Sequence, residues 1–255
     1  VATAIYAACK ATVKVGDGKE ITLHEETNYP FEEAIAFTVS TGEKVAFPFY
    51  LRIPSWTKGA EVRVNGKKVS VTPVAGKYLC INREWANGDR VELTLPMSLS
   101  MRTWQVNKNS VSVDYGPLTL SLKIAEKYVE KDSRETAIGD SKWQKGADSK
   151  KWSTTEIYPD SPWNYSLVLD KKEPLKNFKV IRKSWPTDNY PFTVASVPLE
   201  VKAIGRPVPE WKIDETGLCG VLPEEDAVKG DKEEITLIPM GAARLRISAF
   251  PNTKE

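Results

Sequence analysis

Short runs of alternating apolar and polar residues dominate the first half of the chain. Residues 12–15 and 20–24 alternate with period two around the turn-forming residues 16–19. Residues 35–39 and 45–53 alternate in the same way on either side of the turn sequence TGEK. Successive side chains of a β-strand point to opposite faces of the sheet, so this period indicates half-buried strands. Pro48, within the second pair, predicts a sheet edge or a bulge at that point.

The sharpest turn signal is Asn65-Gly66, which lies between the alternating runs 61–64 and 67–71. Asn and Gly tolerate the positive φ angles that a type I′ turn requires, so a tight β-hairpin is expected here. Further strands are expected at 77–83, at 90–95 and over 110–124, the last run being bent at Gly116-Pro117.

Composition changes at residues 126–162, which are polar and lysine-rich and show no period. This segment is interpreted as a linker or a long excursion from a second domain. The strand rhythm then returns, at 164–170, 177–185, 199–205, 234–239 and 243–250. The pattern predicts an all-β protein with two antiparallel β-sandwich domains (jelly-roll or immunoglobulin-like) in tandem, over residues 1–125 and 126–255.

The stretch LRIPSW, residues 51–56, combines an arginine and a tryptophan and so raises the question of a binding site. Alternation places Leu51 and Ile53 on one face of the strand and Arg52 on the other. Pro54 lacks the N–H that continues a ladder, so the strand is expected to end there. Trp56 would then cap the end of the sandwich, and its truncation to Ala would cost about 3 kcal/mol.

Composition and charge narrow the function classes. The 36 basic and 34 acidic residues leave a net charge of +2, without the clustered basic surplus that nucleic-acid binding needs. No apolar run approaches the roughly 18 residues of a membrane span, and the first residues do not form an intact signal peptide. Because the chain begins with Val, it is interpreted as an excised fragment or a mature product.

Metal-binding and catalytic patterns are missing from the sequence. The three cysteines, Cys9, Cys80 and Cys219, are far apart, and His24 is the single histidine, so neither Cys-x-x-Cys nor His-x-x-x-His spacing occurs. If 20–26 is a strand, His24 and Glu26 share one face and Glu25 points the opposite way. We therefore predict no metal ligand and no catalytic residue in this chain.

Acidic residues are concentrated in turns, where carboxylates usually accept local hydrogen bonds. Residues 84–89, EWANGD, could in principle hold calcium through Asn87 and Asp89. The loop has too few oxygen donors for an EF-hand, so a tight turn in which Asp89 accepts backbone hydrogen bonds is the favoured interpretation.

Tryptophan is the remaining candidate for a binding function, because its apolar face can stack on the C–H face of a sugar ring. A tryptophan is equally suited to a sandwich core if its N–H finds a partner. Core packing is favoured over sugar binding for Trp56 and Trp85, whereas the two possibilities stand level for Trp143 and Trp152, in the polar segment. These four residues are the candidate carbohydrate-binding residues.

The ordered set ETNYPFEE, LRIPSW, VRVNGKKV, GKYLCINREWANGDRVELTLPM and YGPL resembles the region after the catalytic barrel in glycoside hydrolase family 127. These are β-L-arabinofuranosidase-like enzymes. The resemblance covers residues 12–122 well, and ITLIPMGAARLRISAFP, within 163–255, is similar to the family's closing strand.

The resemblance implies that β-sandwich domains follow an N-terminal (α/α)6 barrel, which carries a cysteine nucleophile and a zinc site of cysteines and a glutamate. None of those residues has a counterpart here, so no cofactor is expected in this chain and zinc would belong to the missing catalytic domain. The expected role is a non-catalytic accessory region that packs against the barrel. The alternatives are a carbohydrate-binding module and a free-standing carboxylate glycosidase. A periplasmic or extracellular location is slightly favoured over a cytoplasmic one.

Overall fold

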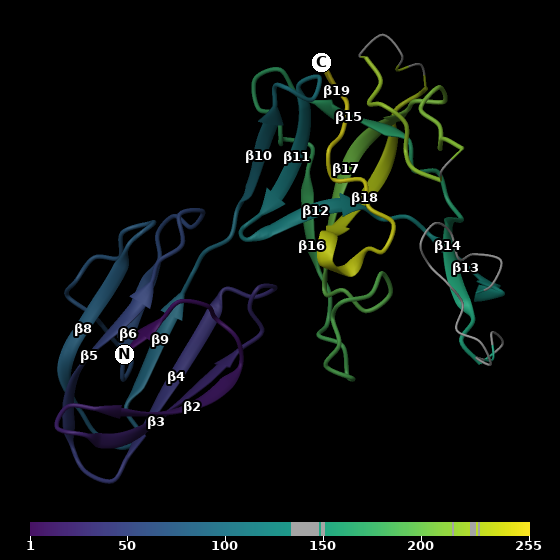
Figure 1. Ribbon diagram of the computed structural model, residues 1–255. Coiled ribbons are helices and arrows are strands. Elements are labelled where there is room, and N and C mark those ends of the chain that lie inside the picture. The colour runs from purple at the N-terminus through teal and green to yellow at the C-terminus, as the bar shows by residue number, and fades with distance from the viewer. Residues whose placement is uncertain (134–147, 149–150, 216, 225–227, 229) are drawn as a thin grey trace. The chain divides into compact units, whose positions relative to one another are not determined.

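The computed structural model describes residues 1–133, 148, 151–215, 217–224, 228 and 230–255 (Figure 1). Within these residues the strands form four sheets, and the one named helix is the 3-10 turn η2 (Met240–Ala242). The prediction of an all-β fold is confirmed. In the part of the chain that is described, no helix is long and apolar enough to cross a membrane.

The chain divides by its contacts into two compact units. The first unit comprises residues 1–100 and 114–118, and the second comprises residues 101–113 and 119–255. Residues 101–113 and 119–125 thus belong to the second unit, and residues 114–118 belong to the first.

The first unit contains a three-stranded sheet in the order β1-β5-β8 and a six-stranded sheet in the order β2-β3-β4-β9-β6-β7. Alternate residues of both sheets are buried in one shared core, as the period-two pattern predicted. The strands are β1 (Ala2–Thr3), β2 (Cys9–Val15), β3 (Lys19–Thr27), β4 (Ala34–Thr41), β5 (Val45–Arg52), β6 (Glu61–Val64), β7 (Lys67–Lys68), β8 (Tyr78–Trp85) and β9 (Arg90–Thr94).

Two of the predicted turns carry the chain from one sheet to the other. The TGEK turn joins β4, which pairs with β3 and β9, to β5, which pairs with β8. The turn after β8 likewise leads to β9 in the six-stranded sheet. Because both sheets contribute to the core, the turn sequence alone does not distinguish a hairpin from a sheet crossing.

Aromatic side chains fill the centre of the first unit. Phe47 stacks on Trp85 with ring centroids 5.6 Å apart. Phe49 contacts Trp85 edge-on at 6.1 Å, and it also contacts Phe37 edge-on at 5.3 Å. The Trp85 indole N–H donates a hydrogen bond to the Phe47 carbonyl at 2.9 Å. The buried indole therefore loses no hydrogen bond on folding.

The predictions for LRIPSW are confirmed at the strand. β5 ends at Arg52, Leu51 and Ile53 are completely buried, and Arg52 on the opposite face is half-buried. Trp56 is partly buried and packs on the edge of the core. Its indole hydrogen-bonds with the hydroxyl of Tyr29.

The hairpin at Asn65-Gly66 is also confirmed, with φ of 49° at Asn65 and 77° at Gly66. The amide of Asn65 donates to Asp89 at 2.7 Å and accepts the Arg90 N–H at 2.8 Å. This side chain thus ties the turn to the loop before β9. The second strand of the hairpin, β7, is only two residues long.

The second unit is built on an eight-stranded sheet in the order β10-β11-β12-β18-β17-β15-β19, with β16 also paired to β17. The bend predicted at Gly116-Pro117 separates β11 from β12, and Gly116 has a φ of 55°. The strands are β10 (Leu99–Trp104), β11 (Ser110–Tyr115), β12 (Leu118–Leu122), β15 (Tyr165–Leu169), β16 (Lys179–Arg182), β17 (Leu199–Pro207), β18 (Glu233–Pro239) and β19 (Asn252–Lys254).

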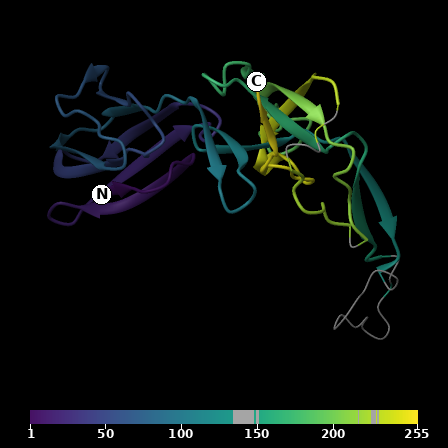
Figure 2. The same cartoon turned by 90° about the horizontal axis from the view of Figure 1, so that it is seen from above.

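The polar segment 126–162 is not wholly irregular, because it contains the two-stranded sheet of β13 (Glu126–Lys131) and β14 (Thr154–Pro159). Figures 1 and 2 show this ribbon beside the larger sheet of the second unit. Neither strand has a fully buried face, so no apolar alternation revealed it.

The strand expected at 243–250 is a wrong prediction. The segment instead follows η2 as an irregular stretch that makes an isolated bridge between Phe250 and Val111 and a backbone bond from the Leu122 N–H to the Ile247 carbonyl at 2.8 Å. The Ile247 N–H donates to the hydroxyl of Ser121 rather than to a backbone carbonyl of β12. Buried side chains at Ala243, Ile247 and Phe250 produced the apolar pattern without a ladder.

Candidate functional site

The four tryptophans proposed from the sequence occupy different environments. Trp85 has no exposed surface and offers no face to a ligand, and Trp56 is partly covered by the core of the first unit. Trp152 lies in the second unit, 64% exposed, with the Lys151 ammonium 5.8 Å from its ring centroid. Trp143 lies outside the described residues. Trp56 and Trp85 thus belong to the first unit, and Trp152 belongs to the second.

His24 and its neighbours follow the alternation predicted for β3. His24 and Glu26 are exposed, while Glu25 points into the first unit and is only 5% exposed. The Ala7 N–H donates to Glu25 at 3.0 Å, and the Cys9 thiol lies 3.9 Å from its second oxygen. Burial raises the pKa of Glu25 to about 7, and these two hydrogen bonds oppose that rise only in part.

Asp89 behaves as the turn interpretation of residues 84–89 requires. Its carboxylate accepts hydrogen bonds from the Ala86 N–H at 2.9 Å and the Asn65 amide at 2.7 Å. Burial by itself would raise the pKa of Asp89, but these bonds and the nearby Arg83 guanidinium outweigh it and lower the pKa. The carboxylate is therefore a structural acceptor in a tight turn.

Residue types that bind metals do not gather into a site in the described part of the chain. Among the described residues, no group of three or more His, Cys, Asp or Glu side chains is placed to hold a metal ion. Cys9 and Glu25 form only a pair, and Cys219 lies in the other unit. The described residues therefore do not fit the zinc site of cysteines and glutamate that the family resemblance implies for the barrel.

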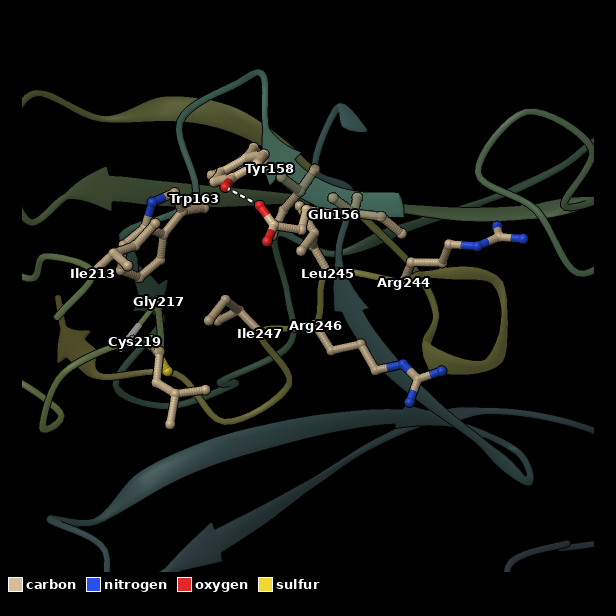
Figure 3. Close-up of a pocket in the computed structure, with 14 residues that line it drawn as sticks. Glu156, Tyr158, Trp163, Ile213, Gly217, Cys219, Arg244, Leu245, Arg246 and Ile247 are labelled. Carbon is tan, nitrogen blue, oxygen red and sulfur yellow. Dashed lines mark hydrogen bonds between the residues drawn. The ribbon is translucent and has the colours of Figure 1, made fainter. Parts of the chain in front are cut away.

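A hollow in the second unit has a volume of about 520 Å³ (Figure 3). It is lined by four segments that are distant in sequence: Ile124 after β12, residues 156–159 with Trp163, Ile213 with residues 217–219, and residues 244–247. The first of these long segments is the end of β14 and the residues after it. The irregular stretch that replaced the expected strand at 243–250 forms the opposite side.

One wall of this hollow is the indole of Trp163, which is held in place by a second tryptophan. The rings of Trp163 and Trp211 meet edge-to-face with centroids 5.2 Å apart. Trp211 is buried, and its indole N–H donates to the Gly220 carbonyl at 3.0 Å. The Asn164 amide donates to the carbonyls of Val208 and Trp211 at 2.9 and 3.1 Å, which anchors the chain beside the hollow.

The polar group of the hollow is a carboxylate–hydroxyl pair on β14. The Tyr158 hydroxyl donates a hydrogen bond to the carboxylate of Glu156, two residues earlier on the same face of the strand (Figure 3). This bond to the carboxylate raises the pKa of Tyr158. Arg244 and Arg246 also line the hollow, but in Figure 3 their guanidinium groups extend away from it.

These features favour binding over chemistry. Glycoside hydrolysis by the common mechanism requires two facing carboxylates, and Glu156 is the one acidic residue among the described residues that line the hollow. An apolar wall with a few convergent polar atoms is instead typical of a ligand site. Sequence reasoning missed Glu156, Tyr158 and Trp163, although the spacing of Glu156 and Tyr158 on one strand face was available as a signal.

The described residues form an all-β region of several sheets. Residues 1–97 match the family model described as the middle domain of GH127 β-L-arabinofuranosidase. The resemblance to glycoside hydrolase family 127 is thereby confirmed. Among curated proteins, none matches the chain in sequence.

Solved structures extend this similarity, at the level of fold, to the whole chain. Ara127N, a GH127 β-L-arabinofuranosidase from Geobacillus stearothermophilus T6, superposes with a TM-score of 0.62 at 22% identity, over 99% of this chain and 33% of that one. A structure described as a glycoside hydrolase superposes with a TM-score of 0.63 at 22% identity, over 99% of this chain and 36% of that one. A GH127 β-arabinofuranosidase superposes with a TM-score of 0.63 at 23% identity, over 99% of this chain and 34% of that one. The chain thus spans about a third of the length of these proteins.

Proposed function

We propose that this chain is the non-catalytic accessory region of a larger family-127-like glycoside hydrolase that acts on plant-type, arabinose-containing glycans. Its role is to pack against and support an N-terminal (α/α)6 catalytic barrel of the same protein. The observation that carries this proposal is the coverage: the fold matches 99% of this chain but only 33–36% of each solved structure. The match of residues 1–97 to a middle domain supports the same placement.

The chemistry of the described residues supports an accessory role. Glu25, the carboxyl whose pKa is raised to about 7, lies in the first unit and faces the segment that contains Ala7 and Cys9 rather than a hollow. Glu156 lines a hollow with an aromatic wall and is the only acid among its described lining residues. The common glycosidase mechanism needs two facing carboxylates, and the described lining residues supply one.

The activity test compares the isolated chain with the protein that includes any upstream region of its reading frame. The substrate is nitrophenyl β-L-arabinofuranoside, with other nitrophenyl glycosides as comparators. The expected result is no turnover by the isolated chain. Hydrolysis by the isolated chain, lost in a variant of one of its own carboxylates, would overturn the proposal in favour of a free-standing glycosidase.

The supporting role has its own measurement. The reading frame is expected to extend about 400 residues upstream, an estimate set by the size of ordinary domains, and to encode the cysteine and glutamate ligands of a zinc site. Co-expression of that region with this chain should give a complex that melts above the upstream region alone. An upstream region that is equally stable and active without this chain would contradict the role. Because such enzymes degrade polysaccharides, a periplasmic or extracellular location is part of the proposal, and fractionation tests it.

A further inference from the structure

We propose that the hollow lined by Trp163, Glu156 and Tyr158 in the second unit binds one or two neutral sugar residues. This goes beyond the supporting role and does not depend on it, since binding requires only the second unit. The two proposals are tested separately. Sugar binding is measured on this chain, and the supporting role is measured on its complex with the upstream region.

The shape of the hollow favours a small, ring-shaped ligand. Its volume of about 520 Å³ lies within the range of small-molecule sites and accommodates a mono- or disaccharide. The wall is preformed, because Trp163 is fixed edge-to-face against the buried Trp211. A rigid indole loses little conformational freedom on binding, which is why aromatic anchors are effective contacts. Ile213 and Ile247 extend the apolar surface beside it (Figure 3).

The polar groups favour hydroxyls over charges. Glu156 is an acceptor for hydroxyl protons, and its bond from the Tyr158 hydroxyl keeps the carboxylate oriented. Glu156 is the only acid among the described lining residues, and a carboxylate there disfavours an anionic ligand. The two arginines that could attract an anion extend away from the hollow, and the Arg246 Nε–H already donates to the Ala243 carbonyl at 2.7 Å. A neutral sugar has an apolar ring face, which fits the indole wall, and hydroxyls along its edge, which fit the carboxylate of Glu156.

The same chain offers a matched control. Tyr128 on β13 also donates to a glutamate two residues earlier, Glu126, at 2.6 Å. Tyr128 and Tyr158 are similarly exposed, at 50% and 45%, but Tyr128 and Glu126 do not line the hollow. In the register of the ribbon Tyr128 pairs with Ile157, so it lies on the face opposite to Tyr158.

The primary test is saturation-transfer NMR with the whole chain and L-arabinose, arabino-oligosaccharides and D-glucose as probes. We expect saturation transfer to at least one of these sugars with a Kd of the order of millimolar, as befits a ligand of about ten to twenty heavy atoms. Glu156→Gln and Trp163→Ala should each weaken binding about tenfold, whereas Tyr128→Ala should leave it unchanged. Circular dichroism melts check that each variant folds. If Trp163→Ala does not fold, Glu156→Gln still tests the proposal.

A second measurement places the ligand in the hollow. Cys219 lines the hollow and is exposed, while the exposed Cys9 lies in the first unit and serves as an internal control. Alkylation followed by peptide mass spectrometry should show that a bound sugar slows modification of Cys219 several-fold and leaves Cys9 unaffected. The proposal is overturned if no probe sugar binds, if binding survives both hollow variants, or if Tyr128→Ala weakens it equally.

Discussion

Glu25 provides the sharpest quantitative prediction, because a carboxyl group is buried where the alternation of β3 requires an apolar residue. Its pKa rises from an ordinary 4.5 to about 7, chiefly through burial. The folded chain therefore holds this proton more tightly than the unfolded chain does. At about 1.4 kcal/mol for each tenfold change in proton affinity, the difference corresponds to about 3 kcal/mol.

The sign follows from which state binds the proton. Below about pH 4.5 Glu25 is protonated in both states, and its ionisation costs nothing. As the pH rises from 4.5 to 7 the unfolded chain releases the proton while the folded chain keeps it, so the free energy of unfolding falls. Above pH 7 the loss is complete, and it stays at about 3 kcal/mol.

Substitution Glu25→Gln removes the charge and retains an acceptor for the Ala7 N–H. We expect the variant to match the parent chain near pH 4.5 and to be more stable by about 3 kcal/mol at pH 8.5, as measured by urea denaturation of the first unit. A shift in Tm of the order of 10 °C at pH 8.5 should accompany it. Glu26→Gln is the matched control, because Glu26 is exposed and pairs with Arg90 at 3.2 Å. A stability difference for Glu25→Gln that does not grow with pH would refute the reasoning.

Four further substitutions test the packing and the charges. Trp85→Ala should destabilise the first unit by about 3–5 kcal/mol. Trp56→Ala should cost only about 1–2 kcal/mol, because Trp56 is partly exposed. Equal losses of stability in denaturant titrations would contradict this order. Gly116→Ala should cost about 1–3 kcal/mol, since the added Cβ would lie 2.7 Å from Met97 Cγ at a φ of 55°, and an unchanged melt would contradict the clash. Glu200 is buried against the ammonium groups of Lys123 and Lys183, at 2.6 and 2.5 Å. Burial alone would raise the pKa of Glu200, but the two ammonium groups outweigh burial and lower it. Glu200→Gln should destabilise the second unit by about 3 kcal/mol at pH 7. The difference should shrink as the pH falls below 4.5, the ordinary pKa, and through the lowered pKa of the folded state. A difference that does not shrink on acidification would contradict this prediction.

Local features were predictable wherever one face of a strand is buried. The faces of Leu51 and Arg52, the Asn65-Gly66 turn and the bend at Gly116 all follow from period-two alternation and from backbone φ preferences. The ribbon of β13 and β14 escaped detection because both its faces are partly exposed. The expected strand at 243–250 failed for the opposite reason, since apolar residues there are buried without a ladder.

Candidate site residues were predicted less well than strands. The sequence identified tryptophans by type, but whether an indole faces a core or a hollow depends on what packs above it. Trp85 is covered by Phe47 and Phe49, whereas Trp163 is held from one side by Trp211 and lines the hollow with another part of its ring. Those neighbours are tens of residues away in the chain, so no local pattern records them.

The sequence by itself determined the all-β class, the positions of most strands and turns, and the resemblance to family 127, because each depends on contacts between near neighbours or on an ordered set of short motifs. Only the tertiary structure decided which sheet each strand joins, that Glu25 is buried, and that Glu156, Tyr158 and Trp163 line one hollow. The physical reason is that burial and convergence are set by long-range packing of distant segments, which alternation along a single strand does not encode.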